Sequence, residues 1–223
     1  MVLVTGASGA LGTAVARRFA AAGDAVAGTS RSWKDKEPPE GIFPLEADLS
    51  RKEAADALVR EVLARHGRLD VLVHVVGGFA GGKPVAETPD AVWERMIEIN
   101  FTAARRMIQA AVPEMERAGG GRIVAVGSRA GEQPAARLAA YACSKAALHM
   151  LVRCAAEELR GAGITVNAVL PSIIDTPANR AAMPGADFSR WVKPEAVAEA
   201  VHWLASPAAA EISGALVPVY GRA

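Results

Sequence analysis

The sequence has little of several features that would assign it to a particular class of protein. Its formal net charge is +1 over 223 residues, so no excess of basic side chains favours nucleic acid or a membrane surface as a partner. No apolar run approaches the roughly 18 residues that cross a bilayer. The chain also opens directly on a strand-like segment, which leaves no room for a signal peptide. We therefore expect a cytoplasmic protein that binds neither nucleic acid nor membrane.

Cysteine is equally scarce. Cys143 and Cys154 are the only two, and they lie 11 positions apart on one predicted helix. That spacing corresponds to roughly 16 Å along the helix axis, whereas the Cα atoms of a disulfide lie within about 7 Å of each other. We expect two free thiols. The histidines have no metal-ligand spacing, so we expect no metal site and interpret them as surface or packing residues: His66, His74, His149 and His202.

Apolar runs typical of buried strands alternate with helix-like segments along the whole chain. Strands are expected at 2–5, 25–29, 42–47, 69–76, 122–127, 164–170 and 215–220, and helices at 10–22, 51–66, 89–118, 135–160 and 194–205, with a kink at Pro113. Strands that are apolar on both faces and separated by helices form parallel sheets covered on both sides. The pattern predicts one α/β domain over residues 1–223, with a Rossmann-type, doubly wound parallel sheet of about seven strands.

Two connecting segments differ from this pattern. Residues 30–41 (SRSWKDKEPPEG) are too few and too rich in proline for a good crossover helix, so we expect a loop there. Residues 171–194 form a long irregular stretch, and long loops in compact domains are commonly functional. We predict a substrate lid at about residues 171–193.

A glycine-rich turn, TGASGALG at residues 5–12, joins the first predicted strand to the first predicted helix. Gly6, Gly9 and Gly12 do not match the dinucleotide fingerprint GxGxxG, because Ser8 stands where its second glycine should be, and no P-loop Lys-Ser/Thr pair follows. The N–H groups of such a turn and the positive end of the helix can still bind a pyrophosphate. A purely structural turn fits the same residues.

A second motif, YACSK at residues 141–145, carries chemistry of its own. Tyr141 and Lys145 are four positions apart on a predicted helix and share a face. A neighbouring ammonium group lowers a phenol's pKa and suits it to proton transfer, although a solvated helix face is the commoner explanation of such a pair by itself. Ser128 follows the strand at 122–127, and ligands bind at the carboxyl ends of such strands. Its hydroxyl could bond the same substrate oxygen as Tyr141.

Taken together, these motifs resemble those of the short-chain dehydrogenases/reductases over essentially the whole chain. They stand in that family's order: the glycine-rich turn, Asp48-Leu49 after the third strand, Asn100 in the long middle helix, Ser128, the Tyr-xxx-Lys motif, and Pro171 followed by Thr176. The resemblance implies the fold described above and an enzyme that transfers hydride between a nicotinamide cofactor and a substrate.

The resemblance also implies a role for each catalytic residue. Tyr141 would be the general acid in reduction and the base in oxidation. Lys145 would lower its pKa and bond the nicotinamide ribose. Ser128 would orient the carbonyl, and Asn100 would hold a water molecule that links Lys145 to solvent. The remaining residues expected at the cofactor are Gly6, Ser8, Gly9, Leu11, Gly12, Ser30, Arg31, Asp48, Leu49, Gly77, Pro171, Ile174 and Thr176, with Asp48 at the adenine and the last three at the nicotinamide.

The cofactor preference is predicted from the end of the second strand. NAD-specific relatives have an acidic residue there that bonds the ribose hydroxyls, whereas this chain has Ser30 followed by Arg31. A guanidinium can bind the 2′-phosphate of NADP(H). Lys34 and Lys36 add positive charge and Trp33 could stack near the adenine, although a solvated basic loop accounts for the lysines as well. We predict NADP(H) in preference to NAD(H).

Three departures from the family pattern stand out. Ala10 takes the place of a glycine in the turn, HVVGG (74–78) replaces Asn-Asn-Ala-Gly after the fourth strand, and Ser172 replaces the glycine that follows Pro171. VVGGFAGG and LPSIIDTPANRAAMPGADFSRW are similar to stretches of the quinonoid dihydropteridine reductases within the family. Those enzymes do not need the serine, so the presence of Ser128 favours carbonyl chemistry.

The sequence thus predicts an NADPH-dependent reductase of ketones or aldehydes, with 3-oxoacyl compounds among the candidate substrates. Met183, Phe188 and Trp191 in the predicted lid suggest a partly apolar substrate, or serve to hold the lid shut. Alternatives are a quinonoid dihydropteridine-type reductase and a non-catalytic NADP-binding regulatory or scaffold protein. The resemblance further implies a homodimer or homotetramer, formed through helices 89–118 and 135–160 and the last strand.

Overall fold

The computed structural model describes residues 1–31, 33, 37–133 and 135–222, and its centre is a single parallel sheet. Seven strands lie in the order β3-β2-β1-β4-β5-β6-β7, and every neighbouring pair is parallel. The strands are β1 (Val2–Thr5), β2 (Val26–Ser30), β3 (Ile42–Glu46), β4 (Val71–His74), β5 (Gly121–Val126), β6 (Ile164–Pro171) and β7 (Leu216–Val219). The predicted Rossmann-type fold is confirmed.

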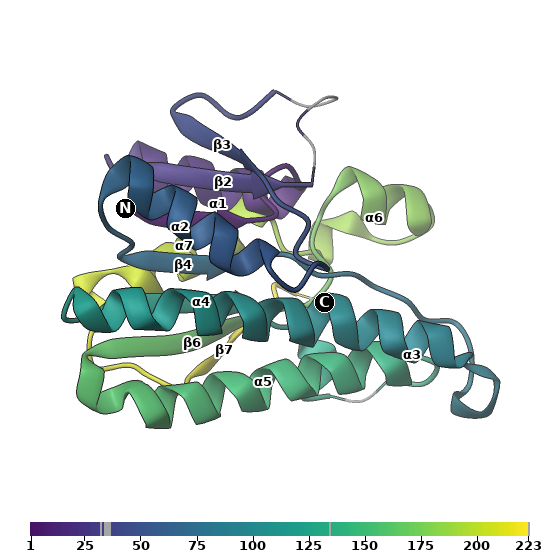
Figure 1. Cartoon of the computed structure of the whole chain (residues 1–223). Helices are drawn as coiled ribbons and strands as arrows, with labels where there is room; N and C mark the ends of the chain where they lie inside the picture. The colour runs from purple at the N-terminus through teal and green to yellow at the C-terminus, as the bar shows by residue number, and fades with distance from the viewer. Residues whose placement is uncertain (32, 34–36, 134, 223) are drawn as a thin grey trace.

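Helices cover both faces of the sheet (Figure 1). One face packs against α1 (Ala10–Ala21) and α7 (Pro194–Ala205), and the other against α2 (Ala54–His66), α4 (Ala103–Arg117) and α5 (Ala139–Leu159). Side chains alternate along each strand, so Leu3 and Leu72 enter one core while Val4 and Val73 enter the other. Every position of β1 and β4 is therefore buried, which explains their continuous apolar character.

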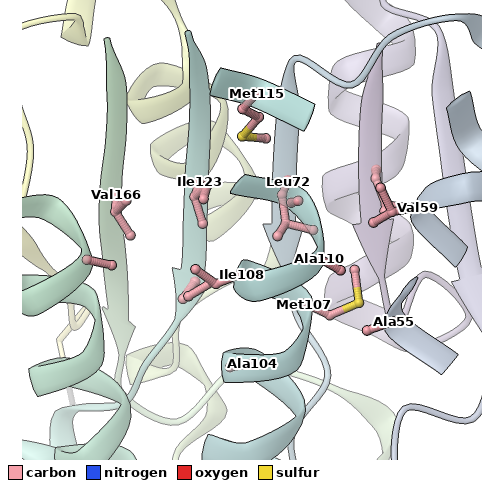
Figure 2. Close-up of a cluster of buried hydrophobic side chains, with 14 of the residues drawn as sticks. Ala55, Val59, Leu72, Ala104, Met107, Ile108, Ala110, Met115, Ile123 and Val166 are labelled. Carbon is pink, nitrogen blue, oxygen red and sulfur yellow. The ribbon is translucent and has the colours of Figure 1, made fainter. Parts of the chain in front are cut away.

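Figure 2 shows the core beneath α4. Met107, Ile108 and Met115 of that helix lie over Leu72 and Ile123 of the sheet, and all five are buried. Burying a side chain of this size stabilises the fold by about 1.5–3 kcal/mol. This layer fixes α4, and through it the segment that precedes α4, against the central strands.

The chain reverses its direction of travel across the sheet at β1. Strand β1 pairs with β2 on one side and with β4 on the other, so the connections from β1 and β4 diverge. In open parallel sheets the crevice at such a point, at the carboxyl ends of the strands, binds the ligand. Residues 5–12 and 74–78 lie on its two sides.

The predicted helix over 89–118 is wrong in detail. It comprises α3 (Asp90–Ile97), a π-helical segment (Glu98–Thr102) and α4, and α4 continues through Pro113. The break therefore lies at Asn100, where the wider π-turn occurs, and not at the proline.

The two segments predicted to be irregular, 30–41 and 171–194, differ in how far the structure matches the prediction. The described residues of 30–41 contain no helix, as expected. The segment after β6, in contrast, contains α6 (Pro177–Ala182) and a 3₁₀ turn at Phe188–Arg190, so it is not a plain loop.

Cys143 and Cys154 are free thiols, as predicted, and both are exposed. None of the helices over the described ranges is long and apolar enough to cross a membrane.

Candidate active site

The turn at residues 5–12 is shaped by its three glycines. Gly6 has φ +68°, a conformation that side chains disfavour. Gly9 is the N-cap of α1. Because glycine has no side chain, it cannot cap the first-turn N–H groups of that helix. A Cβ on Gly12 would lie 2.1 Å from the Gly6 carbonyl oxygen, so α1 packs directly on the turn. This uncapped, positively polarised helix end fits a pyrophosphate.

Thr5 joins this turn to the other side of the crevice. Its hydroxyl accepts hydrogen bonds from the N–H groups of Val75 (3.0 Å) and Val76 (3.3 Å), and it lies 3.2 Å from His74 Nδ1. HVVGG therefore braces β1 against β4. Burial lowers the pKa of His74 to about 3, with a further contribution from the Lys145 charge, so the ring stays neutral. Its Nε2 has no hydrogen-bond partner among the described residues.

Ser128 and Tyr141 are brought together at the carboxyl end of β5. Ser128 caps the 3₁₀ turn Arg129–Gly131, because its hydroxyl accepts the Ala130 N–H at 3.2 Å. Tyr141 lies in the first turn of α5, close enough to Ser128 for the two side chains to interact. The two predicted residues are thus brought to one location, where a carbonyl oxygen could contact both hydroxyls.

Lys145 lies one helical turn further along α5 and is fully buried. Its Nζ donates to the Val126 carbonyl oxygen at 2.8 Å, and burial lowers its pKa to about 8. Burial raises the pKa of Tyr141, and the interaction with Ser128 only partly opposes this. The expectation that Lys145 lowers the pKa of Tyr141 is thus not met in this arrangement. Tyr141 is a protonated phenol at neutral pH.

Asn100 is placed by the π-helical segment. It is fully buried, its Oδ1 accepts the Gly78 N–H (2.9 Å), and its Nδ2 donates to the Gly78 carbonyl (3.0 Å) and to Ser144 Oγ (3.0 Å). A Cβ on Gly77 would lie 2.9 Å from Asn100 Oδ1 and 3.3 Å from Lys145 Nζ. Gly77 therefore leaves room for both polar groups, and the structure brings Asn100 to the same site as Lys145.

The residues predicted to hold the adenosine end lie at the tips of β2 and β3. Ser30 Oγ is 2.8 Å from Ser8 Oγ, which links β2 to the glycine-rich turn. Ser50 holds the pKa of Asp48 below its usual value through its hydroxyl and N–H groups, and the nearby charge of Arg31 lowers it further. Arg31 is exposed on this side of the crevice. Leu11 and Leu49 are buried in the two cores beneath it.

Trp33 packs against the sheet edge. Its indole N–H donates to the Leu45 carbonyl at 3.0 Å, and its backbone N–H donates to Glu46 Oε1 at 3.1 Å. The ring also packs against the core on the α1 side of the sheet. Lys34 and Lys36, predicted to add positive charge, lie outside the described residues.

The segment from Pro171 to Thr176 leaves β6 and enters the predicted lid. Ile174 pairs with Val192 in a parallel bridge, and Thr176 caps α6 by accepting the Asn179 N–H at 3.2 Å. Asn179 Nδ2 in turn donates to the Ile174 carbonyl at 2.7 Å. Ile174 and Thr176 are thus held from both sides.

Ion pairs join Asp175, near the start of this segment, to two basic residues further along the chain. Asp175 is bonded by Arg180 (2.5 and 2.9 Å) and by Lys193. The Arg180 guanidinium also lies 4.7 Å from the centre of the Phe188 ring, which packs on Trp191. Trp191 is buried, so these two aromatic rings pack within the lid.

Sequence reasoning missed two residues beside the proposed catalytic cluster. Phe79 is 65% exposed, and its ring meets Tyr141 edge to face with centroids 5.1 Å apart. Its place directly after Gly77-Gly78 was the available signal. His149 is buried against Ser128 and Glu132, and only its position two turns after Tyr141 on one helix could have suggested this. The described part of the chain has no cluster of three or more residues that could hold a metal.

Comparisons with known proteins show what the whole chain is similar to. A family model described as short chain dehydrogenase matches residues 1–186. The 3-oxoacyl-acyl-carrier-protein reductase MabA of Mycobacterium tuberculosis is 36% identical over 228 residues, which covers 99% of this chain and 91% of the relative. Cis-4-hydroxycyclohexanecarboxylate dehydrogenase of Sinomonas cyclohexanicum is 34% identical, with 99% and 95% covered. The structure of ElxO with NADP bound has a TM-score of 0.92 at 26% identity, with 99% and 96% covered.

Proposed function

Because the chain belongs to the short-chain dehydrogenase/reductase family of NAD(P)-dependent oxidoreductases, we propose that it reduces a ketone or aldehyde to an alcohol with NADPH. The observation that carries this proposal is the proximity of the Ser128 and Tyr141 side chains at the end of β5, with the buried Lys145 one helical turn further along α5. Two hydroxyl groups would then meet at a single substrate oxygen, with the Lys145 ammonium group one helical turn further along α5. That arrangement suits a carbonyl group that gains a proton as it is reduced.

The chain's own residues would handle the proton. Tyr141 is protonated at neutral pH because burial raises its pKa, so it can donate to the carbonyl oxygen. Ser128 would donate a second hydrogen bond that orients the substrate. Lys145, buried beside this pair, would bond the nicotinamide ribose, as the resemblance implies. Asn100 would hold a water molecule that returns a proton from solvent, as the resemblance implies.

The residues present fit a nicotinamide dinucleotide, which when bound supplies the hydride. The uncapped end of α1 and the close packing of Gly6 and Gly12 would hold the pyrophosphate. Arg31, exposed next to Ser30, would bind the 2′-phosphate that distinguishes NADPH, and a carboxylate, which would repel it, is absent from both positions. Asp48 and Leu49 would contact the adenine. Pro171, Ile174 and Thr176 would contact the nicotinamide, and Gly77 would lie beside its ribose.

The candidate substrate follows from a relative's name and from one exposed aromatic ring. The name of the mycobacterial relative makes a 3-oxoacyl thioester the first candidate. The exposed Phe79 ring beside Tyr141 offers an apolar contact for a substrate, whereas Phe188 and Trp191 pack on each other. The likeness to quinonoid dihydropteridine reductases has no support in these comparisons and stays a prediction. A single domain with a lid at 171–193, a homodimer or homotetramer, and a cytoplasmic location are also proposals.

A turnover assay tests the proposed function. Loss of NADPH or NADH absorbance is followed with a β-ketoacyl thioester, simple ketones and aldehydes, a quinone and a quinonoid dihydropterin. We expect turnover of a carbonyl compound, faster with NADPH than with NADH, and loss of that turnover in Ser128→Ala. Reduction of the dihydropterin alone, unaffected by Ser128→Ala, would favour the pterin alternative. Cofactor binding without any turnover would favour the non-catalytic alternative.

A further inference from the structure

His149 connects the helix that carries Tyr141 and Lys145 to the loop that carries Ser128. Its side chain is buried, its Nε2 accepts the backbone N–H of Ser128 at 3.3 Å, and its Nδ1 lies 2.9 Å from Glu132 Oε1. Because Nε2 is the acceptor, the neutral ring carries its proton on Nδ1 and donates it to Glu132. The imidazole thus has a fixed tautomer and two directed bonds.

Two glycines make the slot that this ring occupies. A Cβ on Gly127 would lie 2.5 Å from His149 Nε2, and a Cβ on Gly131 would lie 2.5 Å from His149 Cε1. A Cβ does not come this close to an atom to which it is not bonded, so a side chain at either position would displace the imidazole. The loop on both sides of Ser128 is therefore built around His149.

We propose that His149 is a positioning residue for Ser128. While the His149 ring is neutral, it holds the Ser128 hydroxyl towards Tyr141. The inference rests on the proposed function, in which Ser128 orients the substrate. The hydroxyl of Ser128 accepts the Ala130 N–H, whereas His149 accepts the backbone N–H of Ser128, so the His149 bond acts on the backbone and fixes where that hydroxyl lies. Small displacements of an orienting group are costly in catalysis.

Protonation of His149 would remove this bond. The added proton on Nε2 would face the Ser128 N–H, so two donors would oppose each other. The charged groups that act on the ring are Glu132, which favours the protonated form, and Lys145 and Arg153, which oppose it. Burial is the largest influence and lowers the pKa of His149 below its usual value of 6.5. The positioning bond is therefore present at neutral pH and is lost as the pH falls through that lowered pKa.

The first test is independent of activity. In ¹⁵N-labelled protein, we expect the His149 ring to be the Nδ1–H tautomer at pH 7.5. On acidification, the Ser128 amide signal should move with the same midpoint as that ring, below pH 6.5. In Glu132→Gln the midpoint should fall further, because the carboxylate that favours the charged ring is removed. A Ser128 amide signal that does not move while the His149 ring titrates would overturn the proposal.

The second test uses a matched pair of variants in the turnover assay. In His149→Gln the amide oxygen can take the place of Nε2 and accept the Ser128 N–H, whereas the shorter side chain of His149→Asn reaches only towards Glu132. We expect His149→Asn to lower kcat by about tenfold or more with little change in the KM for NADPH, and His149→Gln to restore most of it. His149→Gln should also lose the fall in kcat at acidic pH, which the control His202→Gln should keep.

Equal kcat values in the Gln and Asn variants, or an unchanged acidic fall in His149→Gln, would contradict the positioning role. If the spectra behave as expected and no carbonyl compound is turned over, the proposed reductase function fails and the linkage between His149 and Ser128 stands.

Discussion

The two sides of the crevice are built on different principles. On the side of β1, the turn at residues 5–12 acts through its backbone, and its glycines serve to bring α1 against the turn. On the side of β5, the cluster acts through side chains, and each of them is held by a second partner: Ser128 by His149, Lys145 by Val126, and Asn100 by Gly78. Glycine matters on both sides, for different reasons.

This difference explains which departures from a motif are tolerated. Backbone N–H groups are present whatever the side chain. Ser8 can therefore stand in place of a glycine of the dinucleotide fingerprint, and Ala10 in place of a glycine of the family pattern. The buried cluster has no such freedom. Gly77, Gly127 and Gly131 lie against Asn100, Lys145 or His149, where any Cβ would intrude on a polar group. A glycine spacing is therefore a weaker signal here than the polar residues that the glycines accommodate.

Among the variants, we expect the greatest loss of activity in the side-chain cluster on the side of β5. Tyr141→Phe removes the proposed proton donor and leaves the ring in contact with Phe79. We expect kcat to fall by about 10³-fold, within the range for general acid catalysis, with cofactor affinity little changed. The matched control is Tyr220→Phe, at the only other tyrosine of the chain, whose ring lies near Arg129. Similar losses in both variants would remove the special role of Tyr141.

Lys145→Met tests the cost of burying the cluster. In the fold the lysine has a pKa of about 8, below its usual 10.5, so at pH 7 the folded state carries the full cost of a buried charge. We expect the variant to be inactive yet more stable at pH 7. Removing the buried charge should raise the free energy of unfolding by at most about 3 kcal/mol, and loss of the hydrogen bond to Val126 reduces this gain. Above about pH 8 the wild-type lysine sheds its proton and this advantage shrinks. Urea denaturation from pH 7 to 9.5 measures it, with the exposed Lys83→Met as the control. A constant advantage would contradict the account.

Gly12→Ala tests the backbone half. The new Cβ would meet the Gly6 carbonyl oxygen, so α1 and the turn must separate. We expect a loss of about 1–3 kcal/mol in unfolding free energy and a raised Kd for the cofactor. Gly161→Ala adds the same group at an exposed position with open space around it, and should change stability by no more than about 0.5 kcal/mol. Equal behaviour of the two variants would show that helix packing does not shape the turn.

The smallest expected effect concerns the cofactor's adenosine end. Arg31→Ala should lower the preference for NADPH over NADH in kcat/KM by about tenfold, since one charge-assisted bond to the 2′-phosphate is lost. The preference should also weaken with added salt in the wild type. Arg60→Ala removes an equal charge from an exposed position on α2 and should leave the preference unchanged. An unaltered preference in Arg31→Ala would place phosphate recognition elsewhere.

Most of the fold followed from local pattern, and part of the site did not. The strands were predictable because apolar runs such as Val2–Thr5 and Val71–His74 are buried on both faces. The π-turn at Asn100 was not predictable from local pattern, since Asn100 is bonded to Gly78, which lies 22 positions away in the sequence. The burial of Trp191 and the contact of His149 with Ser128 are likewise tertiary. The raised pKa of Tyr141 reflects burial, which spacing along a helix does not show.

If this cluster directs hydride to a carbonyl carbon, the label of a deuterated cofactor appears on that carbon. The most direct measurement uses NADPH carrying two deuterium atoms at C4 of the nicotinamide, a 3-oxoacyl thioester and mass spectrometry of the product. We predict one deuterium on the carbinol carbon of the alcohol formed by the wild type, and no such product with Tyr141→Phe over the same time. An alcohol without deuterium, or equal labelling by the Tyr141→Phe variant, would contradict the account.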